Sequence, residues 1–411
     1  MTPFLKFSFL THPWWTALER LVAALDARGP VSPSASALRH AYADLAGSLA
    51  AARRPDVATA IAAGLVDHDA PFQVDASGSP SAGVTRLLEL DLAALAGLAS
   101  RDLGAGVRAA GLTTAPALAD LAPECDDEDR RSVLAELAGA LARGAATEAR
   151  DAYLNVLRTR GSGPAALNQA LRFMGGELAA VASPQGTSLS DLVGLGEQLA
   201  KLVANTQALL ERRPSHNTLL YGPRGSGKST AVRGLLERFG KDGLRLVELP
   251  VEELGQLATL LDDLRHRPQS FVLFVDDLGF EDGDPGYRPL KSLLEGGLSG
   301  RPANVALYAT SNRRHLVKER FADRPDPLDE DVHRWDTHHE KLALADRFGL
   351  TLTFPDAGQR RYLELIRALA ARRELVVDDL DQHAIRFAEW GNGYSGRTAR
   401  QFIDTLMQTL Q

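Results

Sequence analysis

The feature that most constrains this chain is a glycine-rich stretch near its middle. Residues 222–229 read GPRGSGKS, a complete G-x-x-x-x-G-K-[ST] pattern. Glycines let backbone N–H groups curl around a polyphosphate, the lysine reaches its terminal oxygens, and the last hydroxyl binds Mg²⁺. The apolar run 217–221 predicts a buried strand before this loop, and residues 230–237 predict a helix after it. A strand, a phosphate-binding loop and a helix in this order predict an α/β nucleotide-binding domain.

The loop supplies most of the candidate binding residues. An accidental glycine-rich turn is the alternative, and the flanking strand and helix disfavour it. We expect Ser229 to bind Mg²⁺ as well as phosphate. The residues expected to bind ATP here are Gly222, Pro223, Arg224, Gly225, Ser226, Gly227, Lys228, Ser229 and Thr230.

Composition narrows the class of protein. With 411 residues the chain is long enough for two or three domains, and its 45% hydrophobic and 24% charged residues are ordinary for a soluble globular protein. The net charge of −7 argues against a surface built for nucleic acid, although a local basic groove is compatible with it. Cys125 is the single cysteine, so no internal disulfide forms, and we expect a cytoplasmic location. No apolar run reaches about 18 residues, so we expect no membrane span.

The pattern of apolar residues along the sequence changes near residue 185. Residues 1–185 carry alanine and leucine at three- and four-residue spacing, which predicts a mainly helical N-terminal domain that serves a partner or assembly. Trp14 and Trp15 fit either an exposed docking patch or packing against the first helices. Residues 184–188 are typical of a linker.

From residue 189 strands and helices alternate, which predicts a parallel sheet flanked by helices over 186–355. Near-continuous apolar runs are typical of strands covered on both faces. After the strand at 217–221, further strands are expected at 244–249, 271–275, 305–309 and 350–354. Beyond Pro355 a small helical lid is expected over 356–411, with helices at 358–373, 378–390 and 396–409.

Two adjacent acids follow the third strand of this sheet. Asp276 stands where a carboxylate would orient Mg²⁺ together with Ser229. Asp277 is a candidate general base for an attacking water. The alternative is an acidic turn that caps the next helix. Glu281 is a weaker candidate for the same role.

Three more polar residues complete the candidate catalytic set. Asn312 follows the fourth strand and can hydrogen-bond both a γ-phosphate and water; a turn-forming asparagine is the alternative. Arg347 precedes the fifth strand, and Arg397 starts the last predicted helix. Arginines stabilise transferred phosphoryl groups. For both, a surface or helix-capping ion pair is the alternative.

The order of these motifs resembles that of an AAA+ ATPase. In that comparison the loop at 222–229 corresponds to Walker A, and Asp276 with Asp277 to Walker B. Asn312, Arg347 and Arg397 then correspond to sensor 1, the arginine finger and sensor 2. The segment 191–196 is similar to the one that packs on adenine, which adds Val193 and Gly194 to the expected binding residues.

A closer resemblance is to the bacterial AAA+ family catalogued as domain of unknown function 815, over about residues 160–411. It implies ATP and Mg²⁺ as cofactors, a sheet of order 5-1-4-3-2 with a helical lid, and a ring or partial-ring homo-oligomer. The residues that carry this resemblance are 219–225, 276–278, 310–316 and 346–350, with Gly161–Gly163 in the helical half.

One departure concerns turnover. Most AAA+ proteins carry glutamate at the second Walker B position, whereas Asp277 is one methylene shorter. Replication initiators of the same superfamily also carry Asp-Asp and act as slow ATP switches. The resemblance therefore implies ATP binding with slow hydrolysis.

Three functions remain open from the sequence. The first is slow ATP hydrolysis coupled to remodelling of an oligomer or of an unknown protein partner, and the second is a nucleotide-gated binding switch with little hydrolysis. The third is a DNA-processing or loader-type ATPase, which the initiator-like pair Asp276-Asp277 suggests together with a basic group: Arg313, Arg314, Lys318, Arg320 and Arg324. No Asn-Lys-x-Asp guanine motif is present, and His338-His339-Glu340 lacks the spacing of a metal site.

Overall fold

A computed structural model describes most of the chain. The described residues are 5, 7–27, 35–72, 79–109, 118, 128–181, 188–279, 287–295, 301–312, 344–356, 358–391 and 393–410. They form two compact units, Met1–Leu167 and Asn168–Gln411. Cys125, Glu281, the basic group at 313–324 and residues 338–340 lie outside the described ranges.

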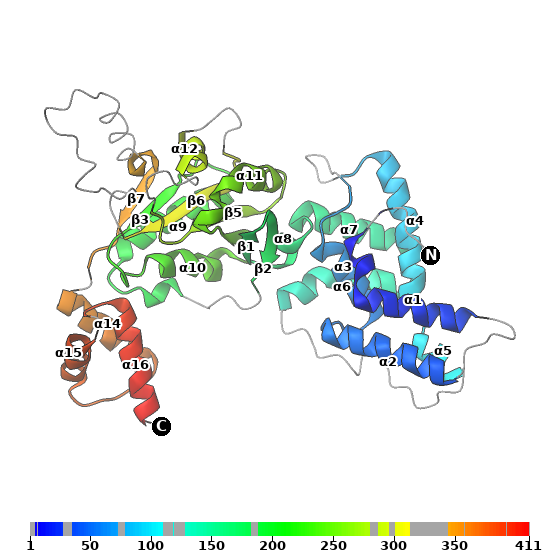
Figure 1. Ribbon diagram of the computed structural model, residues 1–411, viewed down its shortest axis with the longest axis horizontal. Helices are drawn as coiled ribbons and strands as arrows, with labels where there is room; N and C mark the ends of the chain where they lie inside the picture. The colour runs from blue at the N-terminus through cyan, green and yellow to red at the C-terminus, as the bar shows by residue number, and fades with distance from the viewer. Residues whose placement is uncertain are drawn as a thin grey trace. The chain divides into compact units, whose positions relative to one another are not determined.

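The first unit is helical (Figure 1). The Asp56 carboxylate accepts a hydrogen bond from the Thr59 N–H at 2.7 Å and so caps the start of one helix, α3. Trp14 and Trp15 are each only 3% exposed and lie 5.9 and 5.6 Å from the Phe9 ring, which agrees with packing and not with a docking patch. The elements are η1 (Ser8–Thr11), α1 (Pro13–Asp26), α2 (Ala35–Ala51), α3 (Val57–Asp67), α4 (Ala82–Ala99), α5 (Leu103–Ala109), α6 (Glu128–Ala142), α7 (Ala146–Arg160) and α8 (Pro164–Leu167).

The second unit is built on a seven-stranded sheet of order β2-β1-β4-β5-β6-β3-β7. All neighbouring strands are parallel except β1 and β2. Numbered from β3, the five strands β7-β3-β6-β5-β4 have the predicted order 5-1-4-3-2, and the predicted α/β class is confirmed. The strands are β1 (Ala170–Met174), β2 (Glu177–Ala180), β3 (Thr218–Tyr221), β4 (Leu244–Glu248), β5 (Ser270–Val275), β6 (Val305–Ser311) and β7 (Leu350–Thr353).

Strands β1 and β2 correct the prediction that the chain is helical to residue 185. They form a hairpin whose two turn residues, Gly175 and Gly176, both have positive φ, of 60° and 86°. That conformation is typical of two-residue hairpin turns and favours glycine. β1 pairs with β4 through Ala170 and Leu246, so the sheet-bearing unit begins near residue 168 and not at 186. The alanine- and leucine-rich composition hid this signal.

Helices cover the sheet, and three more form the lid. Leu202, Leu235 and Leu352 share a buried core between sheet and helices, whereas Tyr362, Ile366 and Phe402 belong to a separate core within the lid. The remaining elements are η3 (Leu189–Asp191), α9 (Gly196–Leu210), α10 (Lys228–Phe239), η4 (Val251–Gln256), α11 (Leu257–Arg265), α12 (Tyr287–Glu295), η6 (Ala345–Arg347), α14 (Gly358–Arg372), α15 (Leu380–Trp390) and α16 (Gly396–Leu410). Among the described residues, no helix is both long and apolar enough to cross a membrane.

The strand order places the predicted polar residues at one edge of the sheet. β6 lies between β5 and β3, and its residues Ala309 and Ser311 align with Val275 and Tyr221, the last residues of those two strands. Because the strands are parallel, the segments that follow them emerge at the same edge. Ligands of open α/β sheets bind at such carboxyl ends.

Candidate functional site

The loop after β3 turns directly into helix α10. Gly227 has φ +99° and immediately precedes the helix, and its carbonyl accepts a hydrogen bond from the Ala231 N–H at 2.9 Å. A Cβ on Gly227 would lie 2.7 Å from the tip of the Leu192 side chain, which can move, so the backbone angle is what favours glycine here. The helix therefore points its N-terminal N–H groups and its positive dipole end at the loop, which favours an anion there.

Lys228 is buried, with 7% exposure, and its ammonium is held inside the loop. Its Nζ donates to the carbonyl oxygens of Gly222 and Pro223 at 2.7 and 2.8 Å, and to Asn312 Oδ1 at 3.0 Å. Burial lowers the pKa of Lys228, and the charges of Asp277 and Asp276 act in the opposite direction. The ammonium therefore has oxygen partners before any phosphate arrives.

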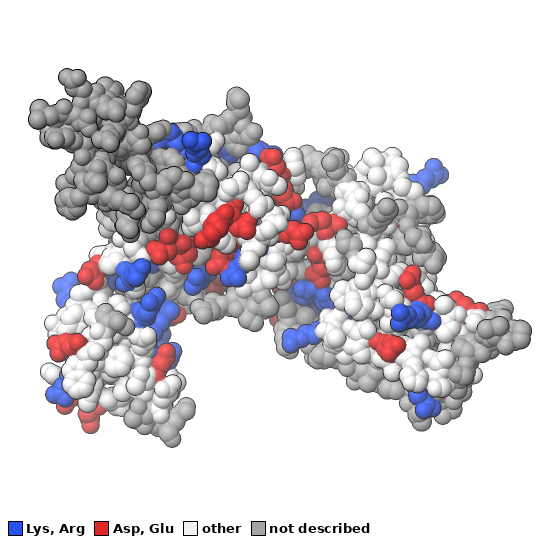
Figure 2. All heavy atoms as spheres, in the orientation of Figure 1, with Lys and Arg blue, Asp and Glu red and all other residues white. Residues whose placement is uncertain are grey.

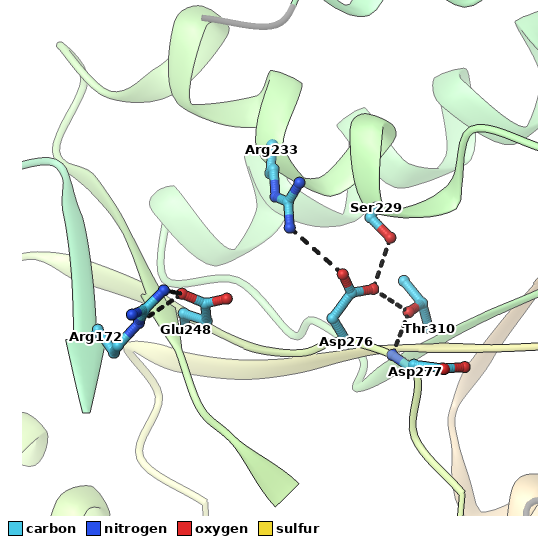
Figure 3. Close-up of polar contacts among 7 residues, drawn as sticks. All are labelled: Arg172, Ser229, Arg233, Glu248, Asp276, Asp277 and Thr310. Atoms are coloured by element: carbon cyan, nitrogen blue, oxygen red, sulfur yellow. Dashed lines mark hydrogen bonds and ion pairs between the residues drawn. The ribbon is translucent and has the colours of Figure 1, made fainter. Parts of the chain in front are cut away.

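Asp276 accepts hydrogen bonds from side chains of helix α10 and of strand β6 (Figure 3). The Ser229 and Thr310 hydroxyls both donate to its Oδ1 at 2.6 Å. Arg233 approaches its Oδ2 at 3.4 Å from the next turn of α10, with its guanidinium 5.8 Å from the Phe274 ring centre. The carboxylate is thus fixed in orientation next to the hydroxyl that the sequence motif assigns to Mg²⁺.

Asp277 is exposed and has a left-handed backbone, with φ +55°. Its N–H donates to Thr310 Oγ1 at 2.9 Å, and its Oδ1 accepts from Asn312 Nδ2 at 2.7 Å. A left-handed residue other than glycine costs about 1 kcal/mol, less for Asp than for most residues, and persists where neighbours fix it. Asn312 therefore joins the two opposite charges of the site, accepting from Lys228 and donating to Asp277.

A cavity of about 690 Å³ opens over these residues, a size typical of small-molecule sites. Six basic and four acidic side chains are among those that line it, and Figure 2 shows basic side chains gathered between α10 and the lid. The lining residues from the sequence prediction are Val193, Arg224, Gly225, Ser226, Gly227, Lys228, Ser229, Thr230, Asp276, Asp277, Asn312 and Arg397.

Three predicted binding residues, Gly222, Pro223 and Gly194, are not among the residues that line the cavity. The carbonyls of Gly222 and Pro223 hold Lys228, as described above. Gly194 has φ +72°, and a Cβ there would lie 3.1 Å from Arg361 Nε. These residues shape the site through their backbone.

The lid closes one side of the cavity. The Gly396 N–H at the start of α16 donates to the Gly225 carbonyl at 3.0 Å, and the next residue, Arg397, is exposed and lines the cavity. Arg372 of α14 forms an ion pair with Asp191 and donates to the Ser190 carbonyl at 2.6 Å. Both the phosphate loop and the 189–194 segment therefore contact the lid.

Arg347 lies away from this cavity. It ends η6, three residues before β7 begins, and Leu350 of β7 aligns with Thr218, the first residue of β3. The edge of the sheet where β3 begins is opposite to the edge where β3 runs into the phosphate loop. The structure therefore does not bring Arg347 together with the other candidate catalytic residues of the same chain.

The residues present fit Mg²⁺ and a polyphosphate. The Ser229 hydroxyl and the Asp276 carboxylate are hard oxygen donors, the kind that Mg²⁺ prefers. Ser226 Oγ is buried on the cavity wall with no hydrogen-bond partner among the described residues, a group that a phosphate oxygen would satisfy. The described residues contain no cluster of three or more His, Cys, Asp or Glu side chains that would hold a metal without a ligand's help.

Several residues that line the site carry no role in the sequence prediction, among them Thr310, Arg233, Arg361 and Arg400. Spacing gives a signal for three of them. Thr310 lies in β6 two residues before Asn312, which follows that strand, Arg233 follows Ser229 by one helical turn, and Arg400 follows Arg397 by three residues. Arg361 has no such signal, because its place depends on how the lid packs. It donates to the Val193 carbonyl at 3.4 Å.

Similar solved structures include two of RuvB from Thermotoga maritima. A RuvB mutant is 18% identical, with 52% of this chain and 62% of that chain covered and a TM-score of 0.36. The RuvB Holliday junction branch migration motor is 16% identical, with 54% and 72% covered and a TM-score of 0.33. AMPPCP-bound DnaA from Aquifex aeolicus is 13% identical, with 55% and 65% covered and a TM-score of 0.37.

A family model gives the family assignment. The model, described as "Protein of unknown function (DUF815)", matches residues 166–410. That range is more than half of the 411 residues and includes the whole sheet and the lid, whereas Gly161–Gly163 precede it. The chain belongs to the DUF815 family of proteins of unknown function.

Proposed function

We propose that this chain binds ATP with Mg²⁺, hydrolyses it slowly, and uses the cycle to change its own assembly or that of a protein partner. The observation that carries the proposal is the convergence of Lys228, Ser229, Asp276 and Asn312 on one cavity beside a helix N-terminus. These residues come from three strand ends and match the motif order of AAA+ ATPases. The cavity, its basic lining and the unpaired Ser226 hydroxyl support a triphosphate ligand.

Each residue has a role that follows from its position. Lys228 exchanges its loop carbonyls for phosphate oxygens, and the N–H groups of the loop and of α10 donate to the same phosphates. Ser229 and Asp276 hold the metal ion, which neutralises charge that develops on the phosphates. Asp277 accepts a proton from the attacking water, and Asn312 orients both that water and the Asp277 carboxylate.

Two arginines would complete the site from different directions. Arg397 reaches the phosphates from the lid of the same chain, because it lines the cavity directly after the lid-to-loop hydrogen bond. Arg347 stands at the opposite sheet edge, so it would reach a nucleotide only in a neighbouring copy. The proposal therefore includes a homo-oligomer.

Calorimetry and turnover measurements on two variants test these roles. Lys228→Ala should abolish ATP binding, since it removes the buried ammonium of the loop. Asp277→Asn should keep ATP affinity within about twofold and lower turnover by about 10²-fold or more, because it removes the proton acceptor alone. Equal loss of binding in both variants would contradict the division of roles, and a wild-type chain that shows no heat of binding at millimolar ATP would refute the proposed function.

A nucleotide-gated switch with little hydrolysis is a second candidate. The hydrogen bond from Asn312 to Asp277 occupies one oxygen of the proposed base, and the backbone contact between Gly396 and Gly225 links loop and lid directly. Such a switch would need tight binding and lid ordering but no fast chemistry. Single-turnover kinetics with purified protein separate the two candidates, because a switch would leave bound ATP intact over many minutes.

A further inference from the structure

We propose that Thr310 is the residue that positions both acids of the site, the metal-binding Asp276 and the base Asp277. This inference rests on the proposed function, because it concerns the same magnesium and nucleotide site. Thr310 is 1% exposed and belongs to β6, whereas the two acids follow β5. Its hydroxyl contacts both acids (Figure 3).

The hydrogen of the hydroxyl has one available direction. The Asp277 N–H is a donor, so Thr310 Oγ1 accepts from it at 2.9 Å. The single hydroxyl hydrogen then donates to Asp276 Oδ1 at 2.6 Å. The Thr310 hydroxyl therefore accepts a hydrogen bond from Asp277 and donates one to Asp276. The two bonds fix the positions of these residues relative to each other.

Thr310 keeps this role when the metal site is formed. Asp276 Oδ1 receives hydroxyls from Thr310 and from Ser229, and the proposed function assigns Ser229 to the metal. The Thr310 hydroxyl then remains to orient Oδ1. Partners of this kind, which contact a metal ligand and not the metal, typically change metal affinity or activity 10- to 100-fold when removed.

The same hydroxyl supports the unusual backbone of Asp277. At φ +55° the N–H of Asp277 is not part of a strand ladder, and Thr310 Oγ1 is the acceptor that it reaches. The next residue, Leu278, donates its N–H to the Thr310 carbonyl at 2.7 Å. Thr310 thus binds three consecutive residues, which sets where the Asp277 carboxylate points.

A neighbouring hydroxyl provides a matched control. Ser311 is also buried, at 1% exposure, and its hydroxyl donates to the Leu278 carbonyl at 2.8 Å. This bond goes to a backbone carbonyl of the same segment, whereas the hydroxyl of Thr310 binds both acids. Ser311→Ala therefore removes a buried hydroxyl of the same strand and keeps both Thr310 hydrogen bonds.

The test measures how much Mg²⁺ tightens binding of a non-hydrolysable ATP analogue. Calorimetry with Mg²⁺ and with EDTA gives this ratio for the wild type, Thr310→Val, Thr310→Ser and Ser311→Ala. For Thr310→Val we expect an unchanged affinity in EDTA and a ratio about tenfold lower than in the wild type. Thr310→Ser, which keeps the hydroxyl, and Ser311→Ala should both keep the wild-type ratio.

The outcomes separate this inference from the proposed function. If the wild type does not bind the analogue, the proposed function is wrong. If the wild type binds it and Thr310→Val shows the same affinity ratio with and without Mg²⁺, only the role of Thr310 is wrong. An equal loss in Ser311→Ala also overturns it, because the effect would then belong to the strand. If Thr310→Val does not fold, as judged by circular dichroism, Thr310→Ala is measured in the same way and decides between these results.

Discussion

At the scale of single residues, the site depends on side chains that donate one hydrogen bond and accept another. The Asn312 amide accepts from Lys228 with its oxygen and donates to Asp277 with its nitrogen. A carboxylate at this position would accept only, and it would repel Asp277. Thr310 is similarly a donor to one acid and an acceptor from the backbone of the other. Groups with both functions allow a positive and a negative side chain to be held a fixed distance apart.

Gly222 provides a prediction for stability at this scale. A Cβ on Gly222 would lie 2.1 Å from the carbonyl oxygen of Phe354, and the Phe354 N–H in turn donates to the Tyr221 carbonyl at 2.8 Å. Gly222→Ala must therefore move β7 away from the loop. We expect a loss of about 3 kcal/mol in the stability of the sheet-bearing unit, measured by urea unfolding without nucleotide.

The matched control for this substitution is Gly255→Ala. Gly255 is exposed, and a Cβ there would meet nothing within 4 Å. We expect this variant to unfold within about 0.5 kcal/mol of the wild type. If Gly222→Ala matched it, the close approach of the loop to Phe354 would not be a feature of the folded chain.

At the scale of elements, the lid is a small helical body with its own core. Tyr362 and Phe402 are buried between α14, α15 and α16, and the Tyr362 hydroxyl donates to the Ala384 carbonyl at 3.1 Å. The lid contacts the rest of the unit through polar groups, such as the ion pair of Arg372 with Asp191 and the backbone bond of Gly396 to Gly225. Exposed ion pairs stabilise by at most about 1 kcal/mol, so nucleotide binding can alter the position of the lid at little cost.

The lid core predicts a loss of stability at alkaline pH. Burial, with a smaller effect of Tyr394, raises the pKa of Tyr362 from 10 to about 12. Between these values the unfolded chain releases the phenolic proton and the folded chain keeps it, so stability falls as pH rises and is unaffected below pH of about 10. Over this pH range the shift of the Tyr362 pKa lowers the free energy of unfolding by about 2–3 kcal/mol.

The measurement compares thermal melting of the wild type and Tyr362→Phe at several pH values. Tyr362→Phe should be less stable by about 1 kcal/mol at neutral pH, since it loses a buried hydrogen bond. It should also lose less stability than the wild type between pH of about 10 and 12. Tyr153 and Tyr308 are also buried and can add to the loss of stability in both proteins. The effect of Tyr362 is therefore the difference in melting temperature between the wild type and Tyr362→Phe. If this difference were the same at every pH, Tyr362 would be excluded as the cause.

At the scale of the whole molecule, the candidate site belongs to the second unit. Every residue that lines the cavity falls between Asp191 and Asp404, within the range matched by the family model. The first unit, Met1–Leu167, has a separate helical core. That this unit serves a partner or the assembly stays a prediction from its sequence.

Arg347 gives the prediction for assembly. Since it lies at the sheet edge opposite the phosphate loop, Arg347→Ala should keep ATP affinity and lower turnover by about 10³-fold. Mixing Arg347→Ala with Asp277→Asn should restore activity, because one copy supplies the arginine and the other an intact site. Solution mass with and without a slowly hydrolysed ATP analogue should show a nucleotide-dependent oligomer, and a mixture as inactive as its components would refute a shared site.

Features that are encoded locally can be predicted from the amino-acid sequence alone. The phosphate loop, the paired acids and Asn312 are recognisable because each follows a short apolar run, and that run is a strand wherever it is buried on both faces. The five strand positions were predictable for the same reason, whereas the lid helices were predictable from the helical pattern after Pro355. The hairpin β1–β2 was missed although Gly175-Gly176 marks it, because alanine and leucine around it favoured a helix.

Which of these local features meet depends on contacts between distant parts of the sequence. That β6 lies between β5 and β3 is a consequence of long-range pairing, and it alone places Thr310 against Asp276 and Asn312 against Lys228. The parallel pairing of β7 with β3 likewise separates Arg347 from the cavity of its own chain. Sequence spacing specifies the chemistry that each strand end carries, whereas the burial of apolar faces selects the strand order and therefore the contacts between those ends.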